Sequence, residues 1–172
     1  MKIKSVILLF ALALSLSAFA GGKYAGVPKK YHALLDRAMV TAGGNAKELK
    51  KALKEVPASE REGMAFLISY MPERDAKTLT ADFLKEHVQY AYKARNEFPW
   101  AKAVPNDIFL NDVVAYVNLN EERESWRKDF YERFKKYVAQ CKTMREAIDS
   151  VNKNIRDEVQ VDYNTKREKA DQ

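Results

Sequence analysis

Apolar residues recur at intervals of three and four along most of this chain, which is the spacing of one buried helical face. Long helices are therefore predicted over residues 28–42, 45–56, 59–71, 80–95, 121–138 and 143–158, and a short, heavily buried one over 108–116. The fold class expected from this pattern is all-α, with about six packed helices.

Polar residues mark where several of these helices should begin and end. Asn45 is placed to cap a helix, with Glu48 completing a capping box, and Thr80 and Thr143 can cap two later helices. Gly43 should end the first helix. The charged residues 73–77 are predicted to be a connection, and residues 99–105, bounded by two prolines, an irregular loop anchored by a tryptophan.

The segment from residue 105 to residue 138 has the densest pattern. Bulky side chains at spacings of four, four, three and one form a stripe that we expect to face the core: Trp126, Phe130, Phe134, Tyr137 and Val138. Acid-before-base pairs such as Asp129 with Arg133 occupy the opposite side and indicate a solvated face. This segment is therefore predicted to be a scaffold rather than a reacting site.

The pattern changes near the C-terminus. In the helix over 143–158 we expect Ala147, Ile148, Val151 and Ile155 to point inward. After it, Val159, Val161 and Tyr163 alternate with polar residues, which predicts a short strand-like segment within an extended tail over 159–172. A frayed tail is the alternative.

The N-terminus has the pattern of a signal peptide. Two lysines precede an apolar run over residues 6–16, and the small-x-small triplet 18–20 predicts cleavage after Ala20. The run is shorter than the ~20 residues of a membrane-spanning helix, so no membrane span is expected. The predicted organisation is a signal peptide over 1–20, a flexible leader over 21–27, and a helical domain over 28–158. The chain is expected to be exported to the periplasm or the extracellular space.

Composition excludes several function classes. The net charge is +6, but the 30 basic and 24 acidic residues are interleaved, so no nucleic-acid partner is expected. Cys141 is the only cysteine, and the only histidines are His32 and His87, on helices elsewhere. A thiol nucleophile requires a nearby base, so no catalytic residue is predicted, and the spacings predict no metal site and no cofactor.

Several motifs, in order along the chain, resemble a known family. They are Phe66-Leu-Ile-Ser-Tyr-Met-Pro-Glu-Arg-Asp75, Leu79-Thr-Ala-Asp-Phe-Leu84 with Ala91-Tyr-Lys-Ala94, Ile108-Phe-Leu-Asn111, Asn120-Glu-Glu-Arg123 with Trp126-Arg127, and Val161-Asp-Tyr-Asn-Thr-Lys-Arg167 with Ala170-Asp-Gln172. Together they resemble the helical N-terminal region of secreted bacterial transglutaminase-like proteins, which belong to the papain-like thiol enzyme superfamily.

The resemblance implies that this chain has a non-catalytic function. The family's catalytic core lies downstream and uses a cysteine in a Ser-Cys-x-Gly motif, a histidine and an aspartate, and Cys141 in Ala139-Gln-Cys-Lys142 does not match that motif. The implied role is that of a helical accessory region, which packs on and shapes the cleft of a downstream Cys/His/Asp core that this chain lacks. The alternative is a self-contained exported helical module that binds a protein, peptide or glycan partner through Trp100, Asp107, Arg123 and their neighbours.

If the resemblance holds, six residues are candidates for interface contacts. They are Asp107, Asn111, Glu122, Arg123, Trp126 and Arg127. Each also has a local explanation, and for Trp126 a place in the core is preferred. For Arg123 and Arg127 an interface contact and a local surface role are more nearly balanced, because arginine suits a buried bidentate interaction with a carboxylate.

Overall fold

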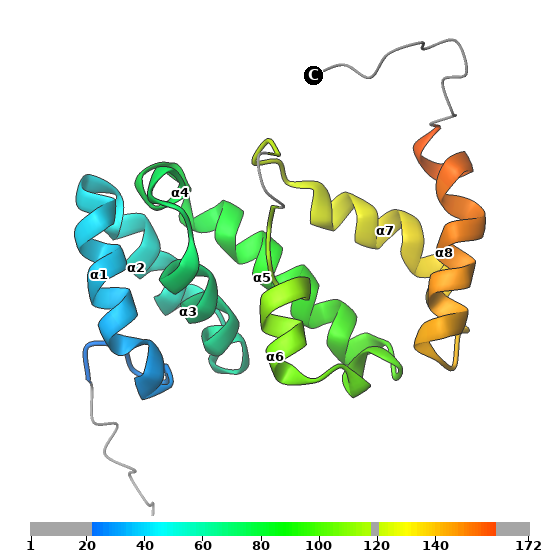
Figure 1. The fold of residues 1–172 in the computed structure, drawn as a ribbon, viewed down its shortest axis with the longest axis horizontal. Coiled ribbons are helices and arrows are strands. Elements are labelled where there is room, and N and C mark those ends of the chain that lie inside the picture. Colours follow the sequence, from blue (N-terminus) through cyan, green and yellow to red (C-terminus); the bar gives the residue numbers. More distant parts are fainter. Residues whose placement is uncertain (1–21, 118–120, 161–172) are drawn as a thin grey trace, which may run out of the picture.

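The computed structural model describes residues 22–117 and 121–160, and all regular structure in these residues is helical (Figure 1). The α-helices are α1 (His32–Ala42), α2 (Ala46–Glu55), α3 (Arg61–Tyr70), α4 (Glu73–Thr78), α5 (Ala81–Glu97), α6 (Asn106–Ile108), α7 (Trp126–Val138) and α8 (Met144–Val159). Short 3-10 turns are η1 (Lys29–Tyr31), η2 (Gly43–Asn45), η3 (Ala58–Glu60) and η4 (Ala101–Ala103), and a π-helical turn is η5 (Phe109–Val113). The all-α prediction is confirmed.

The described residues hold eight α-helices rather than about six. One addition is α4, in the segment predicted to be a charged connection. Val159, the first residue of the predicted strand, is instead the last residue of α8. The rest of the predicted strand and tail, and the predicted signal peptide, lie outside the described residues.

The first five helices and η5 enclose the larger hydrophobic core. Its most deeply buried side chains are Leu35, Leu49, Met64, Ile68, Leu84, Val88, Phe109 and Val114. α1 ends where predicted, since Gly43 adopts a φ of +53°, which side chains with a Cβ rarely tolerate. From the segment assigned to a flexible leader, Tyr24 and Val27 are buried in this core.

The predicted capping box of α2 is wrong, since neither side chain caps this helix. Asn45 instead donates from Nδ2 to the carbonyl oxygens of Ala76 and Leu79, both at 2.9 Å. Glu48 Oε2 accepts the N–H of Ala81 at 3.0 Å. Both side chains therefore fix the junction between α4 and α5, where backbone groups at helix ends lack intrahelical partners.

A smaller cluster joins the end of α5 to η4, α7 and α8. α8 stands at the far end of the molecule from α1 and packs beside α7 (Figure 1). The buried face of α7 carries Tyr131 and Val138, whereas Phe130 is exposed, so the predicted burial of the aromatic stripe is only partly correct. In α8 only Ala147 is fully buried.

Candidate functional site

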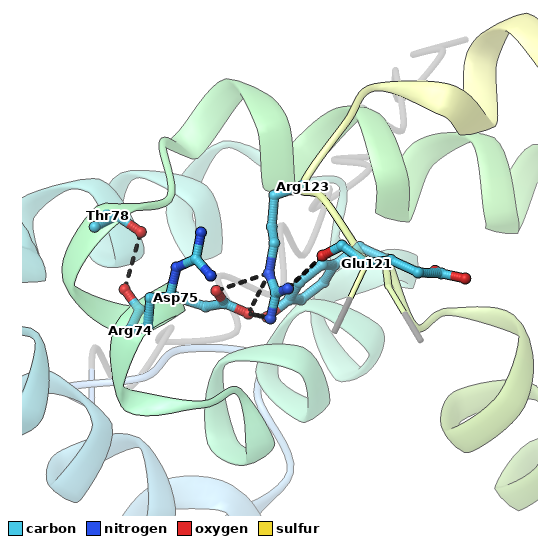
Figure 2. Close-up of polar contacts among 6 residues, drawn as sticks. Arg74, Asp75, Thr78, Glu121 and Arg123 are labelled. Carbon is cyan, nitrogen blue, oxygen red and sulfur yellow. Dashed lines mark hydrogen bonds and ion pairs between the residues drawn. The ribbon is translucent and has the colours of Figure 1, made fainter. Parts of the chain in front are cut away.

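A buried aspartate of α4 is the centre of the candidate site. α4 begins directly after Pro72, whose carbonyl oxygen accepts the N–H of Ala76 at 3.0 Å. Two residues into the helix, Asp75 is 1% exposed, and its carboxylate points toward Arg123 (Figure 2). A carboxylate buried to this extent requires charged or polar partners.

Arg123 supplies most of these partners from a segment 48 residues away in the sequence. Its Nε lies 2.9 and 3.2 Å from the two carboxylate oxygens of Asp75, and its Nη2 lies 3.0 Å from Oδ2. Tyr116 donates its hydroxyl to Oδ2 at 2.8 Å. Arg123 also donates from Nη1 to the carbonyl oxygen of Glu121 (Figure 2). The chain that enters α7 is thus fixed to α4 by a forked ion pair.

The surroundings of Tyr116 and Arg123 raise the pKa of both groups. Burial, followed by the hydrogen bond to Asp75, raises the pKa of the Tyr116 hydroxyl above its ordinary value. The hydrogen bond to Asp75 likewise raises the pKa of Arg123. The phenol therefore stays neutral and the guanidinium stays charged near neutral pH, and the geometry of the three side chains is that of a structural clamp.

One hollow of about 610 Å³, here named the aromatic hollow, lies beside this clamp. It is lined by Phe66, Leu67, Tyr70, Met71, Pro72, Asn111, Ala115, Tyr116, Val117 and Arg123. The rings of Phe66 and Tyr70 lie 4.9 Å apart between centroids, and Tyr70 is 60% exposed. The walls are mostly apolar, with polar groups from Asn111 and Arg123, which is the usual make-up of a ligand site.

A second hollow, of about 620 Å³, is here named the Arg127 hollow. It is lined by Asn111, Asp112, Val113, Ala115, Val117, Glu121, Trp126 and Arg127. The two hollows share Asn111, Ala115 and Val117, so they adjoin along the segment that leads from η5 toward α7.

The first two residues of α7 hold this helix against the segment after η5. Trp126 donates from Nε1 to the carbonyl oxygen of Tyr116 at 2.9 Å, and Arg127 donates from Nη2 to the carbonyl oxygen of Ala115. These side chains provide donors for carbonyl groups beyond the end of a helical turn. The position of α7, and with it the shape of the Arg127 hollow, depends on these bonds.

His87 completes the packing behind the two hollows. Its ring is fully buried in α5, with centroids 5.6 Å from Trp126 and 4.5 Å from Phe83, and its Nε2 lies 3.1 Å from the carbonyl oxygen of Glu124. Burial, assisted by the charge of Arg127, lowers the pKa of His87 to about 4. The imidazole is therefore neutral near pH 7, with Nε2 as the donor to the carbonyl oxygen.

Four of the six predicted interface residues line the two hollows, namely Asn111, Arg123, Trp126 and Arg127. The other two, Asp107 at the start of α6 and Glu122 beside the clamp, are exposed and line neither hollow.

Sequence reasoning missed Asp75, Tyr116 and His87. The sequence holds one signal for Asp75, which is the proline three residues before it. A proline can precede the first turn of a helix, and Asp75 and Ala76 are the buried residues of α4. No local signal identifies its partner Arg123, which is distant in sequence.

The three side chains suited to thiol chemistry lie in separate environments. Cys141 Sγ donates to the carbonyl oxygen of Tyr137 at 3.5 Å, between α7 and α8. His32 lies at the start of α1 with Nε2 3.0 Å from the carbonyl oxygen of Val27, and His87 contacts Glu124. No histidine is thus a partner of the thiol, and thiol–imidazole catalysis needs that contact.

Two further features bear on possible partners. Among residues 22–117 and 121–160, no group of three or more His, Cys, Asp or Glu side chains is arranged to hold a metal ion. In the same residues, no helix combines the length and apolar character needed to cross a membrane.

Comparisons with models of protein families, with curated proteins and with solved structures find no match to this chain.

Proposed function

We propose that this chain is a non-catalytic helical accessory region of an exported transglutaminase-like protein. In this proposal it packs against a Cys/His/Asp core and helps to shape the cleft of that core. The observation that carries the proposal is the α8 apolar face, defined as Met144, Ile148, Val151 and Ile155, which α7 covers only in part.

The α8 apolar face is a continuous stripe rather than scattered residues. Its members follow each other at four, three and four positions, so they lie on one side of the helix. Ile148 is 51% exposed and Ile155 is 39% exposed. Ile148 also lines a hollow of about 230 Å³ together with Trp100. A stripe of this kind favours a protein partner, because burying each large apolar side chain contributes about 2 kcal/mol.

The arrangement of Cys141 and the two histidines supports a non-catalytic role. The resemblance of several ordered motifs to the helical region of transglutaminase-like proteins supports the identity of the partner.

The coding sequence provides the first test. We expect a segment with a Cys/His/Asp set to be encoded after codon 172. A stop codon with no such segment anywhere downstream would contradict the proposal.

The second test concerns the surface. Ile148→Glu should reduce the binding of a dye that fluoresces on exposed apolar surface, and should weaken association with the separately expressed core by about tenfold or more. Val40→Glu is the matched control, since Val40 is 82% exposed on α1, at the other end of the molecule. Equal effects of the two substitutions would exclude the α8 apolar face as the docking surface.

A second candidate function is supported by the aromatic hollow. In it, the chain is a self-contained module that binds a peptide or glycan against the exposed ring of Tyr70. Binding to an array of peptides and oligosaccharides should then be lost in Tyr70→Ala and kept in Val40→Ala. Binding that survives in Tyr70→Ala would exclude this candidate.

A further inference from the structure

The Arg127 hollow contains a half-buried cation whose partners among the described residues are all neutral. Nη2 of Arg127 contacts the carbonyl oxygens of Ala115 and Val114, the latter at 3.5 Å. Nε is buried without an acceptor in the described part of the chain. No carboxylate in residues 22–117 and 121–160 forms an ion pair with this guanidinium, in contrast to that of Arg123. A charge removed from water without a counter-charge is unfavourable.

The place of Arg127 in α7 adds to this imbalance. It is the second residue of the helix, at the end where unpaired backbone N–H groups carry partial positive charge, and cations are disfavoured there. Burial lowers the pKa of Arg127 to about 10, which reflects the cost of keeping its charge in this position. The group remains charged at neutral pH, so an anion in the hollow would be favoured by the guanidinium and by the helix end.

The remaining lining residues restrict the class of that anion. The hollow has apolar walls from Val113, Val117 and the indole of Trp126, over which the guanidinium carbon of Arg127 lies 4.5 Å from a ring centroid. Two acidic residues, Asp112 and Glu121, also line it. A simple anion would be repelled by these two groups, whereas a ligand that also carries an ammonium group would be attracted by them.

We propose that the Arg127 hollow binds a small zwitterion of the amino-acid class. The ligand carboxylate contacts Arg127, the ammonium group faces Asp112 and Glu121, and an apolar side chain lies against Trp126 and Val113. A volume of about 620 Å³ accommodates such a molecule. The inference does not depend on the α8 apolar face or on a catalytic core, so the two proposals can fail separately.

The experiment uses the full chain and ligands that differ by one charged group. Isothermal titration calorimetry with L-leucine is compared with 4-methylpentanoate, which lacks the ammonium group, and with 3-methylbutylamine, which lacks the carboxylate. L-phenylalanine and L-methionine test other apolar side chains. We expect at least one amino acid to bind, and its analogues to bind about tenfold or more weakly, because each leaves a charged group of the site unpaired.

Variants then locate the binding to the hollow. Arg127→Met should abolish it in protein whose circular dichroism spectrum shows that the helical fold is kept, because the ligand carboxylate then has no cation to contact. Arg133→Met is the matched control, since Arg133 lies on the same helix, half-exposed and paired with Asp129, and binding should be unchanged. If Arg127→Met does not fold, Asp112→Asn provides the test, because it should reduce the preference for the amino acid over 4-methylpentanoate.

Three results would overturn the proposal. The first is that none of the three amino acids binds at millimolar concentration, and the second is that 4-methylpentanoate and L-leucine bind equally. The third is that binding persists in Arg127→Met. Where that variant does not fold, the third is instead an unchanged preference of Asp112→Asn for the amino acid over 4-methylpentanoate.

Discussion

The clamp between α4 and the start of α7 predicts a large loss of stability when Asp75 is replaced. In Asp75→Ala the buried hydroxyl of Tyr116 loses its acceptor, at a cost of about 1–3 kcal/mol. The guanidinium of Arg123 loses its only carboxylate partner in the described residues. Removing one member of a buried ion pair costs about 3–5 kcal/mol in total, and we expect the lower end, about 3 kcal/mol, because Arg123 can turn toward water.

For a chain of this length, about 3 kcal/mol corresponds to a decrease of roughly 6–12 °C in the thermal midpoint. Circular dichroism during heating and during urea denaturation measures both quantities. Glu73→Ala is the control, since Glu73 lies on the same helix, is exposed and pairs only with Lys77 among the described residues, and it should leave the midpoint unchanged. Tyr116→Phe should lower stability by about 1.5 kcal/mol in the unaltered chain, and it should be neutral or stabilising in the Asp75→Ala background, because it then removes a hydroxyl that has lost its acceptor.

A structural role for the clamp would be excluded if Asp75→Ala were no more destabilising than Glu73→Ala. In that case Asp75 would be solvated in solution, and the start of α7 would not be held on α4. Additive effects of Asp75→Ala and Tyr116→Phe would also contradict the clamp, because the two groups would then act independently.

Three further substitutions test other parts of the fold. The pKa of His87 is lowered to about 4, so below about pH 6.5 the unfolded chain binds a proton at this residue and the folded chain does not. The free energy of unfolding should therefore fall by about 2 kcal/mol from pH 8 to pH 5, relative to His87→Phe. Parallel pH profiles of the two proteins in urea denaturation would exclude this. Thr143→Ala should cost about 1 kcal/mol in the same assay, because Thr143 Oγ1 caps α8, and an unchanged midpoint would contradict the cap. Gly63→Ala should destabilise the fold by about 1–3 kcal/mol, although alanine normally favours a helix, because the new Cβ would lie 2.6 Å from a ring atom of Tyr92. Gly44→Ala should be tolerated, because there is open space around Gly44. A larger loss of stability in Gly44→Ala than in Gly63→Ala would contradict this packing.

The sequence predicted the fold where the determinants are local. Thr80 accepts the N–H of Phe83 and Thr143 that of Glu146, as their places before helices predict. The same rule failed for Asn45 because its amide finds two carbonyl groups more than 30 residues away, and no local pattern shows which partner will be preferred.

The orientation of α7 shows a second limit. Helical periodicity places Trp126, Phe130 and Phe134 on one side, but the neighbouring side that carries Tyr131 is equally bulky. Tyr131 faces inward because α5 and the residue that follows it present aromatic contacts, with Tyr90 at 5.3 Å and Phe98 at 6.3 Å between ring centroids. Which stripe is buried therefore depends on the partner helix, and the periodicity of α7 alone could not show it.

The candidate site shares this dependence on distant partners. Resemblance and residue type selected Arg123 and Arg127, because both suit recognition of carboxylates. Their environments proved opposite, since Arg123 is neutralised by Asp75 and Arg127 contacts only neutral groups among the described residues. That difference is set by α4, which the sequence pattern did not identify as a helix.

The two clusters of the molecule are unequally stabilised, and the difference explains where partners should act. The larger cluster is cross-linked by polar contacts of the half-buried Asn45 and Glu48 and of the buried Asp75. α8 is held to α7 by the smaller cluster and by contacts such as the Ser150 hydroxyl on the carbonyl oxygen of Tyr137 at 2.9 Å, and its apolar face is half open. Local opening should therefore begin at α8, and amide hydrogen exchange should be faster there than in α5. A partner that covers the α8 apolar face would therefore stabilise a helix whose own apolar side chains are only partly covered.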